Sequence, residues 1–159
     1  MDIFEFAMQM EKDGESYYRD LAGRVDNKGL KNILTMLADA EVVHYDIFKK
    51  MKDNITVKVS DTPILSKVKN VFAQMKKENE TTGAPHSQIE LYRKAQEIEK
   101  KSRDFYLEKA EERKDQKEIF LKIAEEERMH YNILAQLIDF VSRPQTWLED
   151  AEWYHMEEY

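Results

Sequence analysis

Apolar residues recur along this chain in steps of three and four, which is the spacing of one face of an α-helix. The pattern predicts four long helices, over residues 2–24, 28–53, 87–113 and 115–142. A shorter helix is predicted over residues 64–77, inside a connection that spans residues 54–86. A connection of that length can carry the chain from one end of a bundle to the other. The predicted fold is therefore all-α, a four-helix bundle of two helical hairpins joined by a long crossover.

Short local signals mark where these helices begin. Three pairs have the spacing of a capping box, namely Asp2 with Glu5, Ser87 with Glu90 and Asp115 with Glu118. Thr62-Pro63 has the form of a cap followed by proline at the first helical position, and Ile55–Val59 is a short β-like run before it. We expect residues 1–142 to form the bundle domain. Residues 143–159 carry four aromatic side chains and are predicted to pack on the bundle as a C-terminal tail.

Polar residues interrupt the apolar stripe near the middle of each long helix. They are Glu11 in the first helix, Glu41 and His44 in the second, Glu99 in the third, and Glu127 and His130 in the fourth. The Glu-x-x-His spacing places both side chains on one helix face, about 5–6 Å apart at Cβ. A carboxylate buried in a core is destabilising unless it is paired or bound to a metal. Something must therefore compensate these groups.

An internal repeat relates the two halves of the chain. A shift of 86 residues superimposes Glu41 on Glu127 and His44 on His130, and a shift of 88 superimposes Glu11 on Glu99. The repeat is far less easily produced by chance than one Glu-x-x-His motif in a Glu-rich chain. It predicts two similar hairpins that contribute equivalent residues to one interior site.

Four inward carboxylates and two inward imidazoles are the residues that a dinuclear metal site in a helix bundle requires. Four carboxylates balance the charge of two divalent cations, so a buried site of this kind is close to neutral. Oxygen-rich ligation with one imidazole per metal suits iron or manganese. We predict two iron ions, with manganese or zinc as possible substitutes, and no catalytic residue beyond the six metal ligands.

Composition excludes several other classes of function. The net charge of −7 argues against nucleic-acid binding, and no apolar run approaches the roughly 20 residues that a membrane span needs. The chain has no Cys, which excludes disulfides, thiolate metal sites and thiol catalysis within it. We therefore expect a cytoplasmic protein that contacts neither nucleic acid nor a membrane.

Around these residues the sequence resembles the rubrerythrin family of the ferritin-like superfamily. Met10-Glu11-Lys12-Asp13-Gly14-Glu15-Ser16-Tyr17-Tyr18 and Ala124-Glu125-Glu126-Glu127-Arg128-Met129-His130 carry the likeness, which extends over residues 2–142. The resemblance implies a ferritin-like bundle in which Glu41 and Glu127 bridge two metals. Glu11 and Glu99 would be terminal ligands, and His44 and His130 would each bind one metal. Members of the family reduce hydrogen peroxide, while related ferritins oxidise and store iron.

Two departures from the family pattern change what the resemblance implies. Rubrerythrins carry a C-terminal rubredoxin domain with four Cys, and this sequence contains none. They also carry an extra carboxylate three residues after the ligand of the third helix, where this chain has Ser102. The first departure predicts an external electron donor such as rubredoxin. The second predicts that His44 and His130 stay bound in both oxidation states.

Two functions are compatible with the sequence. The first is a di-iron oxidoreductase that reduces hydrogen peroxide, or dioxygen, in defence against oxidative stress. The alternative is an iron-binding protein of ferroxidase type that sequesters iron without multiple turnover. The long crossover allows two chains to exchange hairpins, so we expect a homodimer.

Other conspicuous residues have simpler interpretations. Glu152 and His155 form a third Glu-x-x-His motif, but no second motif pairs with it, so a packing or surface role is favoured. Glu97 lies about 200° round the helix from Glu99 and should face solvent. Tyr18 and Tyr106 lie one to two turns from ligands, where we favour core packing over hydrogen bonds to the site.

Overall fold

The computed structural model describes residues 2–60, 64–78 and 84–142. Its helices are α1 (Ile3–Gly23), α2 (Lys28–Lys52), α3 (Ile64–Lys77), α4 (His86–Glu112), the short 3-10 helix η1 (Lys114–Gln116) and α5 (Lys117–Ser142). The prediction of an all-α fold with four long helices and a shorter crossing helix is confirmed. Thr62-Pro63 and the tail 143–159, including Glu152 and His155, lie outside the described residues.

Side-chain caps fix the start of the first hairpin's two helices. Asp2 accepts a hydrogen bond from the Glu5 backbone N–H at 2.7 Å, and Asn27 accepts one from Leu30 N–H at 2.9 Å. The Glu5 carboxylate also takes a hydrogen bond from the Asp2 backbone, as a capping box requires, so this predicted box is confirmed, and it pairs with Lys52 Nζ at 2.7 Å. That pair joins the start of α1 to the end of α2.

The C-terminal end of α2 is closed by Asn54, whose φ of 58° is left-handed. The Asn54 N–H donates to Met51 O at 3.1 Å and the Ile55 N–H to Lys50 O at 2.8 Å. These bonds satisfy carbonyls at the end of the helix, as in a Schellman motif, and asparagine tolerates this conformation better than most residues.

The other two predicted capping boxes are wrong. Helix α4 begins at His86, one residue earlier than predicted, with Pro85 at the N-cap and no side-chain cap bond. The Pro85 carbonyl instead accepts from Gln88 N–H at 2.9 Å, and its own φ of −64° is already set for the helix start. Asp115 lies inside η1 rather than at a cap, and α5 begins at Lys117.

The β-like run Ile55–Val59 forms no strand among the described residues. Its alternation has another cause. Val57 and Val59 are half-buried against an apolar cluster of the bundle, while Lys58 between them and both Ile55 and Thr56 before them are exposed. An extended segment lying on a helical surface alternates for the same reason that a strand does.

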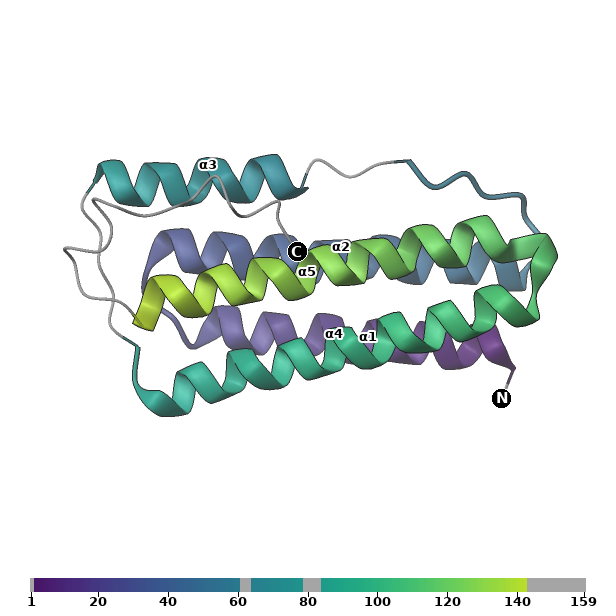
Figure 1. Ribbon diagram of the computed structural model, residues 1–159, viewed down its shortest axis with the longest axis horizontal. Coiled ribbons are helices and arrows are strands. Elements are labelled where there is room, and N and C mark those ends of the chain that lie inside the picture. The colour runs from purple at the N-terminus through teal and green to yellow at the C-terminus, as the bar shows by residue number, and fades with distance from the viewer. Residues whose placement is uncertain (1, 61–63, 79–83, 143–159) are drawn as a thin grey trace.

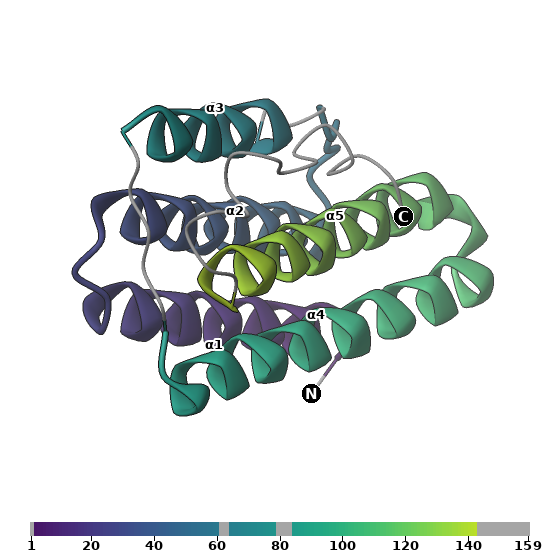
Figure 2. The same cartoon turned by 60° about the vertical axis from the view of Figure 1, so that its left-hand side comes forward.

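The four long helices form two antiparallel hairpins, α1 with α2 and α4 with α5 (Figure 1). Helix α3 runs along the outside of the bundle and contacts both α2 and α5, as the turned view also shows (Figure 2). The segment 54–85 thus returns the chain to the end of the bundle from which α2 started, so that α4 runs parallel to α2. This is the ferritin-like arrangement.

The buried core is split into two apolar clusters by a polar layer. One cluster contains Leu21, Leu34, Tyr92 and Leu137 together with buried residues of α3, and the other contains Phe4, Phe48, Tyr106 and Phe120. On every long helix, the interrupting Glu or Glu-x-x-His lies in sequence between a residue of one cluster and a residue of the other. The two clusters therefore hold the four helices in register above and below this layer.

Helix α3 belongs to the first cluster alone. It buries Ile64, Val68, Phe72 and Met75 there. Close approach of α3 to α2 depends on Gly29, since a Cβ at that position would lie 2.6 Å from Met75 Cγ. A glycine in the first turn of α2 is thus explained by packing.

Candidate metal centre

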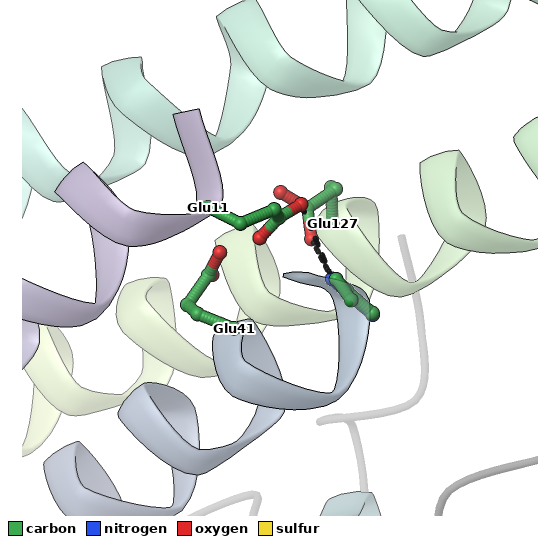
Figure 3. Close-up of side chains that lie close together, drawn as sticks. Glu11, Glu41 and Glu127 are labelled. Atoms are coloured by element: carbon green, nitrogen blue, oxygen red, sulfur yellow. Dashed lines mark ion pairs between the residues drawn. The ribbon is translucent and has the colours of Figure 1, made fainter. Parts of the chain in front are cut away.

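The polar layer brings together all six residues singled out by the sequence. Glu11 comes from α1, Glu41 and His44 from α2, Glu99 from α4, and Glu127 and His130 from α5. None is more than 3% exposed. Figure 3 shows the carboxylates of Glu11, Glu41 and Glu127 converging from three helices. So many buried ionisable groups in one place need a common partner.

The residues form two overlapping clusters suited to metal ions. The first comprises Glu11, Glu41, His44 and Glu127, and the second comprises Glu41, Glu99, Glu127 and His130. In each cluster the four potential ligand atoms lie within 4.8 Å of one another. Glu41 and Glu127 belong to both clusters, which is the position that a bridging carboxylate occupies.

Both imidazoles turn the same ring nitrogen toward the carboxylates. His44 Nδ1 lies 3.1 Å from Glu127 Oε1 and 3.4 Å from Glu11 Oε1. His130 Nδ1 lies 3.5 Å from Glu99 Oε1. The two rings are nearly parallel, with centroids 5.9 Å apart. Nδ1 is therefore the nitrogen that each histidine presents to the site.

Several buried polar atoms of the site lack a hydrogen-bond partner among the described residues. They are Glu11 Oε2, Glu99 Oε2, Glu127 Oε1, His44 Nδ1, and both ring nitrogens of His130. Buried polar atoms are rarely left unpaired, and an unpaired group calls for an explanation such as an ion. Carboxylate oxygens with one imidazole nitrogen in each cluster are a donor set that suits iron or manganese. The residues thus fit a pair of divalent cations.

Without metal, burial and the neighbouring charges shift the pKa values of the site residues. Burial and then repulsion from the other glutamates raise the pKa of Glu41 and of Glu127 well above the usual value. Burial acts to lower the pKa of His44, but the neighbouring Glu11 outweighs it and the pKa is raised. Burial acts to raise the pKa of Glu99, but His130 and hydrogen bonds outweigh it and the pKa is lowered. Cations entering the site would replace protons.

Two tyrosines hold Glu11 and Glu99, the glutamates that belong to one cluster each. Tyr18 O–H on α1 donates to Glu99 Oε1 on α4 at 2.5 Å, and Tyr106 O–H on α4 donates to Glu11 Oε1 on α1 at 2.8 Å. Our preference for core packing alone was wrong, because both hydroxyls bond directly to the site. Burial is the main cause that raises the pKa of both phenols, so they remain donors. Each bond also joins one hairpin to the other.

Glu126 is a buried site residue that sequence reasoning did not single out. It is 5% exposed, and its Oε1 lies 3.0 Å from His44 Nε2. This places a carboxylate behind the imidazole, on the opposite side of the ring from the metal clusters. The internal repeat could have identified it. Glu126 and Ala40 occupy equivalent positions, each directly before a Glu-x-x-His motif, and one is charged where the other is apolar.

Two small residues separate the site from a surface hollow. A Cβ at Gly14 would lie 3.1 Å from Glu41 Oε2, so a larger residue would push that carboxylate by a few tenths of an ångström. Ser102, the repeat equivalent of Gly14, is 6% exposed. Both residues line a hollow of about 480 Å³ between α1 and α4, whose walls include Phe6, Tyr17 and Phe105. Glu97 is exposed, as predicted.

Within the part of the chain that the structure describes, no helix is both long enough and apolar enough to cross a membrane. In comparisons with known proteins, the Rubrerythrin family model matches residues 2–138. Searches of curated proteins and of solved structures gave no match. The matched span contains all six residues of the two clusters, together with Tyr18, Tyr106 and Glu126.

Proposed function

This chain belongs to the rubrerythrin family, and on that premise we propose that it is a non-haem di-iron protein that reduces hydrogen peroxide or dioxygen. The observation that carries the proposal is the pair of buried clusters sharing Glu41 and Glu127. A site with that composition is suited to two redox-active ions held close together. Several of its buried oxygen and nitrogen atoms make no hydrogen bond among the described residues, which supports the same interpretation.

In this proposal each cluster holds one iron. Glu11 and His44 would serve one ion, Glu99 and His130 the other, and Glu41 and Glu127 both. Two ferrous ions would supply the two electrons that convert peroxide to water, a reaction that also consumes two protons. Four carboxylates offset the four positive charges of the ferrous pair, which makes its burial tolerable.

The residues of this chain would orient ligands and limit access to the ions. Tyr18 and Tyr106 fix the terminal glutamates and keep protons on their hydroxyls beside the site. The two apolar clusters exclude bulk water from above and below. The hollow between α1 and α4, lined by Gly14 and Ser102, is where a small oxidant would approach the site.

Electrons for repeated turnover would come from a separate protein such as rubredoxin. The 159 residues contain no Cys and so no thiolate-bound iron of their own. We further propose that the protein works as a homodimer, because its long crossover allows two chains to exchange hairpins. We also propose that it is located in the cytoplasm.

Anaerobic loading with Fe²⁺ followed by a peroxide titration tests the proposal. We expect two ferrous ions per chain to be oxidised by one equivalent of peroxide, and steady consumption once rubredoxin and its reductase are added. Consumption should stop when the donor is omitted. Loaded protein that peroxide does not oxidise would contradict the proposal.

Ser102 specifically favours a second candidate function. A neutral hydroxyl replaces the extra carboxylate of typical family members, which leaves the six-ligand set of a ferritin-type site. Such a site would oxidise and sequester iron. A single oxidation by dioxygen, with no turnover even when a donor is present, would favour this alternative.

A further inference from the structure

The two halves of the candidate centre are nearly equivalent. The sequence repeat relates each residue of the Glu11–His44 cluster to one of the Glu99–His130 cluster. It also relates Tyr18 to Tyr106, and these tyrosines make the same kind of hydrogen bond in opposite directions. By this symmetry alone, two metal positions would have the same affinity.

Glu126 breaks the equivalence. Its carboxylate lies 3.0 Å from His44 Nε2, deep inside the bundle. The repeat-equivalent position is Ala40, whose buried methyl group offers no acceptor. His130 Nε2 is correspondingly buried with no hydrogen-bond partner among the described residues. Among the described residues, His44 alone of the two histidines has a carboxylate behind its ring.

A carboxylate at that place changes what the histidine can do. It accepts the Nε2–H, which fixes the tautomer with its lone pair on Nδ1, fixes the ring orientation and increases the basicity of the ligating nitrogen. Loss of such a partner typically weakens metal binding by about 10- to 100-fold. His130 has none of these advantages in the described structure.

We propose that Glu126 is a positioning residue for His44 and makes the two metal positions inequivalent, so that the first divalent ion occupies the Glu11–His44 cluster. Glu126 is not itself a ligand in this assignment, since it lies on the Nε2 side of the ring and belongs to neither cluster. The inference rests on the proposed function only in requiring that the six residues bind metal. It does not depend on turnover.

An anaerobic titration of the whole chain with Fe²⁺, with the heat of binding measured by calorimetry, tests the inference. The parent should bind two ions in two separable steps. Glu126→Ala should weaken the first step by about 10- to 100-fold and leave the second unchanged. Glu126→Gln, whose amide oxygen still accepts the Nε2–H, should retain part of the difference. Glu125→Ala is the matched control, because it removes an exposed carboxylate from the preceding position of α5.

Histidine variants identify which step belongs to which cluster. His44→Ala should remove the tighter step and His130→Ala the weaker one. If His130→Ala removes the tighter step, the assignment is overturned. Equal weakening of both steps in Glu126→Ala would show a general loss of structure and would also overturn it.

A spectroscopic signature separates positioning from simple packing. In protein loaded with diamagnetic Zn²⁺, the His44 Nε2–H should give a slowly exchanging ¹⁵N-coupled proton resonance. That resonance should persist in Glu126→Gln and be lost in Glu126→Ala. Its persistence in Glu126→Ala contradicts the proposed bond. A parent protein that binds no metal would overturn the proposed function as well, whereas two identical steps would overturn this inference alone.

Discussion

At the scale of single residues, the two glutamates shared by both clusters differ from those that belong to one. Removing Glu41 or Glu127 takes a ligand from both metal positions at once, whereas removing Glu99 affects the His130 side alone. We therefore expect Glu127→Ala and Glu41→Ala to lose most bound iron, and Glu99→Ala to retain the ion of the Glu11–His44 cluster. Metal analysis after anaerobic loading and desalting measures this.

Glu97→Ala serves as the control for these variants. It removes an exposed carboxylate two residues from Glu99 on the same helix, so its iron content should equal that of the parent. Equal iron loss in Glu99→Ala and Glu127→Ala would mean that Glu127 does not bridge.

A second prediction at this scale concerns Ser102, buried three residues after Glu99 on α4. Ser102→Glu restores the carboxylate of typical family members at a position that faces the site. Peroxide should oxidise the loaded diferrous variant faster than the parent, because the added carboxylate can bind iron when oxidation raises its positive charge. Stopped-flow absorbance under anaerobic conditions measures the rate, and Ser102→Ala is the control of unchanged charge. A loaded variant that reacts at the parent's rate would show that Ser102 does not limit the reaction.

At the scale of helices and their contacts, close packing between α3 and α2 leads to a third prediction. Gly29→Ala would force the buried Met75 side chain out of its place, since the new Cβ lies 2.6 Å from Met75 Cγ. The atoms in the way all belong to the flexible Met75 side chain, which can shift and lose only part of its buried area. Losing all of that burial would destabilise the protein by about 1.5–3 kcal/mol, and replacing helical glycine by alanine gains up to about 1 kcal/mol. We therefore expect a small net destabilisation, below about 1 kcal/mol, in urea unfolding.

Gly23→Ala is the matched control. A Cβ at Gly23 meets nothing within 4 Å, so only the gain in helix propensity remains and stability should rise slightly. If both alanine variants were stabilised alike, α3 would not depend on Gly29 for its approach to α2.

The features that could be predicted from the sequence are those that depend on interactions between residues close together in the chain. The polar layer was predictable because each Glu or Glu-x-x-His interrupts the apolar stripe of its own helix, which is local information. The bond from Tyr18 to Glu99 joins residues 81 positions apart, and nothing in the spacing of Tyr18 distinguishes it from a core tyrosine. Glu126 was missed for the same reason, because its partner lies on a different helix. The start of α4 was misplaced because Pro85 replaces a side-chain cap.

At the scale of the whole molecule, metal content should set how stability depends on pH. The pKa values of Glu41, Glu127 and His44 are raised in the folded apoprotein, so it binds more protons than the unfolded chain. Apoprotein stability should therefore fall as pH rises above the ordinary values, 4.5 for the two glutamates and 6.5 for His44, through these raised values. The lowered pKa of Glu99 acts in the opposite sense, as pH falls below that value.

Bound metal should reverse this dependence. Metal binds the deprotonated ligands, so its stabilising effect grows with pH and reaches about 2.7 kcal/mol at a hundredfold excess over Kd. Calorimetric melts at several values from about pH 5 to about pH 8 should show the gap between apo and loaded Tm widening as pH rises. A gap that stays constant or narrows, with loading confirmed by metal analysis, would contradict this account.

The division of the six site residues between the hairpins has a consequence for ancestry. Each hairpin supplies three residues to one cluster and a single shared glutamate to the other, so two copies of one hairpin would complete both clusters. The chain thus has the form that duplication and fusion of a single hairpin gene would leave. In a dimer of two identical hairpins, every substitution would appear in both copies. Fusion removes that restriction, because each half of the fused chain can then change separately. Glu126 in one half, with Ala40 at the equivalent position of the other, is a difference of this kind.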